Sequence, residues 1–132
     1  MNVFKTISAL FLLGSLTLVA CNFDAAQEEE TTELLQGRWD LSEAYRSGKK
    51  TETLTGTFFE FLPERKLIYN LAGLREEVSY NLDGQTITPL ESRQSVTFMI
   101  EELDAGKLTL SMVMRNTPFK FVLLKKGEEM IQ

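Results

Sequence analysis

Short runs of β-forming residues, separated by turn residues every eight to twelve positions, are the feature of this sequence that most limits its fold. Asp83-Gly84 predicts a two-residue hairpin turn, because glycine supplies the positive φ that a type I′ turn needs. Residues 104–106 predict a three-residue hairpin, residues 47–50 a longer loop, and residues 116–118 a turn. The expected strands are residues 37–45, 56–62, 66–71, 76–82, 85–90, 95–103, 107–114 and 119–125.

Alternation of apolar and polar residues gives these runs an inner face. The inward positions are Phe59, Phe61, Val78, Tyr80, Leu82, Phe98, Ile100, Leu108, Leu110, Met112, Met114, Phe119, Phe121 and Leu123. About eight antiparallel strands joined in sequence order fit an all-β, up-and-down β-barrel, since closure removes exposed strand edges.

The N-terminus has the pattern of a secretion signal. Residues 1–6 carry one positive charge, Lys5, and residues 7–19 form an apolar run too short for a stable membrane span. The run ends in Leu18-Val19-Ala20-Cys21, which resembles the lipobox of bacterial lipoproteins. The resemblance implies cleavage between Ala20 and Cys21, a diacylglycerol on the Cys21 thiol and an acylated amino terminus. Two or three acyl chains, such as palmitate, hold a protein stably on a membrane.

The residues after the cysteine suggest a spacer in the cell envelope. Asn22 follows Cys21, where aspartate often signals inner-membrane retention, so we expect the outer membrane rather than the inner one. The acidic run at residues 28–30 and the scarcity of apolar groups predict an extended tether, or alternatively an address for surface export. The expected organisation is a signal peptide at 1–20, a lipidated acidic tether at 21–30, a barrel at 31–126 and a tail at 127–132. Residues 31–35 could add one helical turn with a threonine cap.

Gly37-Arg38-Trp39 at the start of the first expected strand resembles the G-x-W motif of the lipocalins. In that family the tryptophan closes one end of an eight-stranded barrel, and a basic residue from the last strand packs over it. The resemblance therefore implies a barrel floor built from Gly37 and Trp39, with Lys125 or Lys126 in the basic role. The sequence departs from the family pattern in lacking a T-D-Y motif and in having lysine for the usual arginine.

Composition excludes several kinds of chemistry. The chain has no histidine and a single cysteine, so it can form no Ser-His, Cys-His or His-metal site and no internal disulfide. A formal charge of −5 makes nucleic acid a poor partner, because phosphate binding needs a basic surface. We expect no cofactor, no metal and no enzymatic activity. The acidic pairs Glu76-Glu77, Glu101-Glu102 and Glu128-Glu129 suggest the two carboxylates of a glycosidase, but strand neighbours point to opposite faces, so no pair is itself a site. We interpret these pairs as solvated charge instead.

The expected inner face suggests an apolar site. Candidate ligand-lining residues are Phe59, Tyr69, Tyr80, Phe98, Leu110 and Met112, each of which could equally be plain core. Arg75, Arg93 and Arg115 lie at or near expected strand ends and could meet an anionic ligand, or could simply be solvated.

Two functions follow from these features. The first is a monomeric, membrane-anchored barrel that binds a small hydrophobic or amphiphilic molecule, as the resemblance to lipocalins implies. The alternative is an envelope interaction or inhibitor module that has a filled barrel and contacts a protein partner with its outer surface. Interior volume distinguishes them: a cavity of several hundred cubic ångströms favours the ligand, and a solid core favours the partner.

Overall fold

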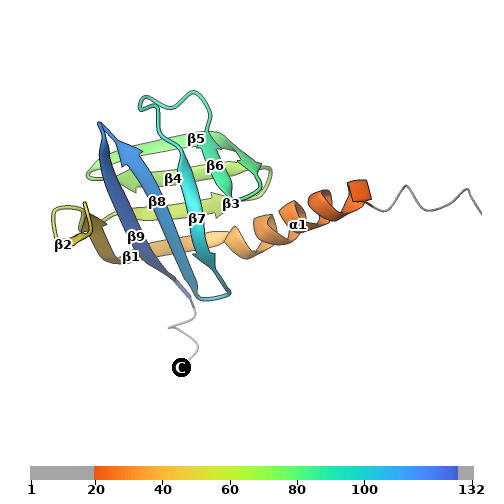
Figure 1. Cartoon of the computed structure of the whole chain (residues 1–132), viewed down its shortest axis with the longest axis horizontal. Helices are drawn as coiled ribbons and strands as arrows, with labels where there is room; N and C mark the ends of the chain where they lie inside the picture. Colours follow the sequence, from red (N-terminus) through yellow and green to blue (C-terminus); the bar gives the residue numbers. More distant parts are fainter. Residues whose placement is uncertain (1–19, 128–132) are drawn as a thin grey trace, which may run out of the picture.

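The computed structural model describes residues 20–127, with side chains from residue 26 onward (Figure 1). Except for Ala20 and Gly127, the expected signal peptide and C-terminal tail lie outside the described residues, and so does the side chain of Cys21. The elements are α1 (Ala20–Leu35), β1 (Gly37–Arg46), β2 (Lys49–Thr51), β3 (Phe58–Leu62), β4 (Lys66–Leu71), β5 (Leu74–Asp83), β6 (Thr86–Pro89), β7 (Phe98–Leu103), β8 (Lys107–Met114) and β9 (Thr117–Lys125).

The strands form one antiparallel sheet that closes on itself. The strand order is β2-β1-β3-β4-β5-β6-β7-β8-β9, and β1 also pairs with β9, from Trp39 opposite Lys125 to Arg46 opposite Phe119. The strands other than β2 make an eight-stranded up-and-down barrel. The short strand β2 pairs with the last residues of β1, Ala44 to Arg46. The all-β, lipocalin-like barrel that the sequence predicts is therefore confirmed.

The barrel has two different ends. The closed end carries the end of α1 and the turns at residues 63–65, 84–85 and 104–106. The open end carries the turns at residues 47–48, 72–73 and 115–116 and the longer β6–β7 loop, residues 90–97, which rises above β5 and β6 in Figure 1. We use these two names below.

The turn between β5 and β6 lies one residue further along the chain than the sequence predicts. Asp83 pairs with Thr86, so the β5–β6 turn is Gly84-Gln85 rather than Asp83-Gly84, with Gly84 at φ 61°. This is the first central position of a tight hairpin turn, where glycine is favoured.

The β8–β9 turn also differs from the expectation. It is the two-residue turn Arg115-Asn116, with both φ values positive, and not the segment 116–118, because Met114 already pairs with Thr117. The expected loop at residues 47–50 is shorter as well: Lys49 and Lys50 belong to β2, which pairs back onto β1.

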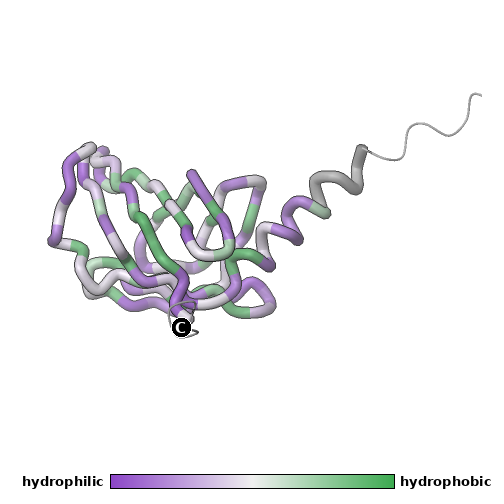
Figure 2. Tube along the Cα trace, turned by 90° about the horizontal axis from the view of Figure 1, so that it is seen from below, coloured by the Kyte–Doolittle hydropathy of each residue, from purple (hydrophilic) through white to green (hydrophobic). Residues whose placement is uncertain are grey.

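The expectation of an extended tether at residues 22–30 is wrong, because this segment is part of α1. Residues 25–30 read Ala-Ala-Gln-Glu-Glu-Glu, which are strong helix formers, and this intrinsic preference outweighs repulsion among the carboxylates. The Thr31 and Thr32 hydroxyls donate hydrogen bonds to the carbonyls of Gln27 and Glu28. The described part of α1 is hydrophilic over much of its length (Figure 2). Within the described residues no helix is long and apolar enough to cross a membrane.

The closed end is sealed by Trp39 and the last residue of α1. Trp39 and Leu35 are both fully buried, and the indole Nε1 donates a hydrogen bond of 2.7 Å to the Leu35 carbonyl. The Lys125 ammonium lies 5.2 Å from the centre of the Trp39 ring, where the lipocalin resemblance puts a basic residue. Gly37 has φ 120°, and a Cβ there would come within 2.8 Å of Lys125 Cε. Glycine is therefore favoured mainly by the backbone conformation, because the end of the flexible Lys125 side chain could move away from a Cβ.

Candidate functional site

The six expected ligand-lining residues all lie in the barrel interior, where they contact each other rather than an open space. Their exposed fractions are 0% for Phe59, Phe98 and Leu110, 1% for Tyr69 and Tyr80, and 5% for Met112. A cavity large enough for a ligand would leave its lining accessible to water-sized molecules. The interior around these residues is therefore solid.

Aromatic rings account for much of this filling. The Phe59 ring lies at the centre, with the Phe98 ring edge-on at 5.0 Å and the Tyr69 ring stacked at 5.8 Å. The rings of Phe61 and Phe121 lie 6.4 and 6.2 Å from it. Such pairs gain about 0.5–1.5 kcal/mol each beyond the burial of their area, which makes the filled state stable.

A polar cluster whose tyrosine and carboxylate are buried lies at the open end of this apolar interior. The Tyr69 hydroxyl donates to Glu76 Oε2 at 2.9 Å, and the Ser92 hydroxyl donates to the same oxygen at 2.8 Å. The backbone N–H of Arg93 donates to Glu76 Oε1 at 2.8 Å. We call Tyr69, Glu76, Ser92 and Arg93 the polar clamp, because it joins β4 and β5 to the β6–β7 loop.

The clamp changes the acidity of two of its members. Burial opposes the charged form of Glu76, but hydrogen bonds from Arg93 N–H, Ser92 and Tyr69, with the charge of Arg93, outweigh it and lower the pKa of that carboxyl. Burial and the neighbouring carboxylate raise the pKa of Tyr69 to about 12, although the hydrogen bond with Ser92 acts in the opposite direction. Glu76 is therefore ionised and Tyr69 neutral at physiological pH.

The interpretation of Glu76 as solvated charge is wrong, since its exposed fraction is 8%. The alternation of β5 contained the signal: Glu76 has the same parity as Val78, Tyr80 and Leu82, which all point inward. Its neighbour Glu77 is exposed and forms an ion pair with Arg75 at 2.9 Å. Sequence reasoning also missed Ser92, because only the course of the β6–β7 loop brings it to Glu76.

Tyr80 does not join Tyr69 at the open end. Its backbone N–H donates to the Arg65 carbonyl in the turn between β3 and β4, which is part of the closed end. The buried Tyr80 hydroxyl has no hydrogen-bond partner among residues 20–127, and burial raises its pKa. The two tyrosines therefore cannot orient the same end of one ligand.

The three arginines named from the sequence lie at the open end but do not meet at one site. Arg75 pairs with Glu77, and the Arg93 guanidinium, 79% exposed, lies 3.8 Å from Glu76. Arg115 is exposed in the β8–β9 turn. In the part of the chain that is described, no group of three or more His, Cys, Asp or Glu side chains could hold a metal ion.

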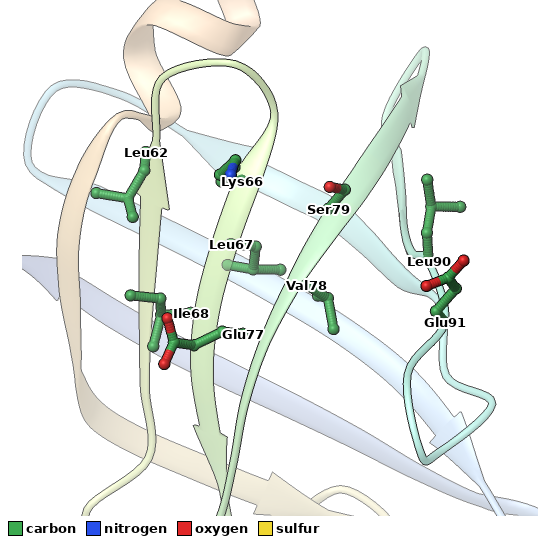
Figure 3. Close-up of a pocket in the computed structure, with 9 residues that line it drawn as sticks. All are labelled: Leu62, Lys66, Leu67, Ile68, Glu77, Val78, Ser79, Leu90 and Glu91. Carbon is green, nitrogen blue, oxygen red and sulfur yellow. The ribbon is translucent and has the colours of Figure 1, made fainter.

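Two hollows open on the surface of the barrel. One of about 440 Å³ lies over β4 and β5 and is bounded by the start of the β6–β7 loop (Figure 3). Its wall includes the exposed residues Lys66, Glu77, Ser79 and Glu91, together with Leu67 and Val78, which pack in or against the core. A second, of about 600 Å³, follows β9 between β1 and β8. Neither includes Phe59, Phe98 or Leu110 in its wall.

Comparison with solved structures supports the fold. The chain is similar to a lipocalin-like protein from Bacteroides uniformis, with 18% identity and a TM-score of 0.50 over 70% of this chain and 98% of that one. An uncharacterized protein from Bacteroides eggerthii matches with 20% identity and a TM-score of 0.49, over 69% of this chain and 98% of that one. No protein-family model and no curated protein matches. At this identity the likeness to the Bacteroides uniformis protein shows the lipocalin-like fold and nothing finer.

Proposed function

We propose that the chain is a non-catalytic lipoprotein of the bacterial cell envelope that binds a protein partner with the outer surface and loops of its barrel. The observation that carries this proposal is the solid interior: Phe59, Phe98 and Leu110 have no exposed surface. A barrel without an internal cavity has only its outside to offer a partner. The Leu18–Cys21 lipobox supports the membrane anchor.

The solid interior can be tested by making a cavity. Leu110→Ala should leave an apolar space that stays dry and accepts a benzene-sized molecule, whereas the wild-type protein should bind no such probe. Trp39 fluorescence reports whether the variant is folded. Equal binding of apolar probes by the wild-type protein would contradict the proposal.

The anchor can be tested separately. Cys21→Ser should abolish incorporation of radiolabelled palmitate and leave the precursor unprocessed by the lipoprotein-specific peptidase, because the thiol is the group that is alkylated. Incorporation of label into the variant would show that the lipobox interpretation is wrong. Fractionation of cells that carry the wild-type protein would test the expected outer-membrane location.

Binding of a small amphiphilic molecule is the second candidate, favoured by the polar clamp at the open end of an apolar interior. The Tyr69 hydroxyl and the Glu76 carboxylate could orient a polar head group once aromatic side chains had moved. In this case fatty-acid-like or aromatic fluorescent probes should bind to the wild-type chain and be displaced by lipid. Failure of a broad panel of such probes to bind to the wild-type chain would contradict this candidate.

A further inference from the structure

Five basic residues lie on the β1–β2 and β8–β9 hairpins, which meet at the open end. The β1–β2 turn is held against β9, because the backbone N–H of Ser47 donates to the Pro118 carbonyl at 2.9 Å. Arg46 lies opposite Phe119 in the β1–β9 ladder, and Lys120 lies opposite Tyr45. We call the following residues the basic corner: Arg46, Lys49, Lys50, Arg115 and Lys120. Figure 1 shows β1, β2, β8 and β9 together on this side of the barrel.

Few carboxylates pair with the positive charges of the basic corner. All five side chains are exposed, and the ion pairs among the described residues include only Lys50 of the five, 3.9 Å from Glu43. The Arg46 guanidinium lies 5.9 Å from the Phe119 ring. A chain of net charge −5 thus concentrates positive charge at one place on its surface, and such a patch attracts anionic groups from a distance.

A groove with apolar residues begins at the corner. The groove of about 600 Å³ along β9 includes Gly48, Pro118 and Lys120 at this end, with the half-buried side chains of Tyr45 and Val122 in its wall. Its wall also includes two carboxylates: Glu43, which lies 3.9 Å from Lys50, and Glu101, which accepts a hydrogen bond from the Ser111 hydroxyl. Val113, opposite Pro118 in the β8–β9 ladder, is 65% exposed. Cations and apolar surface therefore lie next to each other on the outside of the barrel.

The opposite end of the barrel has the opposite charge. Between residues 26 and 127, the closed end and α1 carry eleven acidic and six basic side chains, whereas the open end carries five acidic and seven basic ones. The chain reaches its anchor through α1, so the acidic end is the one tethered to the membrane. The basic corner lies at the far end of the barrel from this tether, which favours a protein partner over the lipid head groups of the anchoring membrane.

We propose that the basic corner and the adjoining groove bind an acidic segment of a partner protein in which apolar side chains alternate with carboxylates. This inference rests on the proposed function and names the surface and the partner chemistry. Lys and Arg would pair with the carboxylates, while apolar side chains would contact Tyr45, Val113 and Val122. Complementary charge would speed association and make it sensitive to salt.

The ligand for the binding test is a fluorescent peptide of alternating Glu and Leu. Its binding to the full chain in detergent is measured by fluorescence anisotropy at low and at high salt. Arg46→Glu with Lys120→Glu should weaken binding by about tenfold or more, because two attractive contacts become repulsive. The matched control is Lys66→Glu with Lys126→Glu, which makes the same change in net charge at the closed end. We expect this control to change affinity by less than about twofold, since exposed charges more than about 10 Å away are screened.

Three results would overturn the inference. The two double variants could lose affinity equally, which would indicate attraction to net charge alone. A peptide with Gln in place of Glu could bind as well as the acidic one. Vesicles of anionic phospholipid could bind the corner while the acidic peptide does not, which would indicate a lipid surface instead.

Photo-crosslinking in cells separates this inference from the proposed function. A crosslinker at Val113 lies on the proposed surface, and one at Leu74, 51% exposed in β5, is its matched apolar control. An adduct from Val113 that disappears in the Arg46→Glu, Lys120→Glu background supports the inference. Adducts from Leu74 alone would overturn it and leave a surface-binding function intact. Adducts from neither position would contradict both.

Discussion

Glu76 Oε1 accepts a hydrogen bond of 2.8 Å from the backbone N–H of Arg93, which lies 17 residues further along the chain. The β6–β7 loop is thereby attached to the barrel wall by a charged group whose exposed fraction is 8%. A buried carboxylate is stable only when its oxygens are satisfied, and here the loop supplies two of the donors, Arg93 N–H and the Ser92 hydroxyl. The loop and the acid therefore depend on each other.

Loss of the Glu76 charge should destabilise the protein at neutral pH but not in acid. The pKa of Glu76 is lowered in the folded state, so its contribution is present above the unfolded value of 4.5 and is lost as pH falls through the folded pKa. Glu76→Gln should therefore be less stable than wild type at pH 7, with the difference shrinking below about pH 4.5. Denaturant unfolding across pH measures this. Glu77→Gln, one residue away and exposed, is the control and should show a much smaller change.

The contribution of Tyr69 to stability should be lost at high pH, whereas that of Glu76 is lost in acid. Its pKa is raised from 10.0 to about 12 in the folded state, so the stability it contributes is present below pH 10 and is lost as pH rises through about 12. Tyrosinate absorbance should show a late-titrating component near pH 12 that Tyr69→Phe removes, while Tyr80, whose pKa is also raised by burial, still titrates late in the variant. A wild-type titration without a late group, or one unchanged in Tyr69→Phe, would show that the hydroxyl is not buried against Glu76.

The barrel floor should be sensitive to both of its motif residues. Trp39→Ala should cost about 3–5 kcal/mol, the usual range for removing a buried large aromatic side chain. Gly37→Ala should cost about 1–3 kcal/mol, because φ 120° is a conformation that alanine rarely adopts. Thermal and denaturant unfolding, followed by Trp39 fluorescence for the Gly37 variant, measure these changes.

A double variant identifies the cause of the Gly37 effect. Gly37→Ala combined with Lys125→Ala removes the close approach of Lys125 Cε but keeps the backbone strain. We expect the double variant to recover little of the stability lost in Gly37→Ala, compared with Lys125→Ala alone. Full recovery would instead assign the cost to the Lys125 side chain.

Only the last turn of α1 should matter for the barrel. Leu35→Ala should cost about 2–5 kcal/mol, because Leu35 is fully buried beside Trp39. Gln27→Pro should disrupt the helix, since proline in a helix interior costs about 3 kcal/mol or more, and yet leave the melting of the barrel nearly unchanged. Far- and near-ultraviolet circular dichroism separate the two effects. A large fall in barrel stability in Gln27→Pro would show that the helix supports the fold.

Local patterns in the sequence predicted most of the fold. Alternation along residues 107–114 placed Leu108, Leu110 and Met112 inside, and the structure buries all three. The three-residue turn at 104–106 was also predicted, because Asp104 Oδ1 can accept from the N–H groups of Gly106 and Lys107. Such features depend on neighbours close in sequence, which a period of two residues or a turn motif records directly.

The same local reasoning failed where two tendencies compete. Residues 22–30 are both strongly acidic and good helix formers, and the sequence does not say which tendency prevails. The turn Arg115-Asn116 was missed because its boundaries follow from the register of β8 against β9. A register is set by pairing between strands and by their packing, and so it is decided only when the sheet forms.

The sequence by itself determined the fold class: an all-β barrel with Trp39 near the start of its first strand. The resemblance of Leu18–Cys21 to a lipobox stays a prediction. Only the tertiary structure decided that the interior is solid, because the packing of Phe59, Phe98 and Leu110 depends on how side chains from three separate strands meet. It also decided that Ser92 and Arg93 donate hydrogen bonds to Glu76, and that the β1–β2 and β8–β9 hairpins, which carry five basic residues, meet at the open end. The physical reason is the same in each case. Burial, hydrogen bonding and charge depend on distances in space, and these join residues that no sequence period connects.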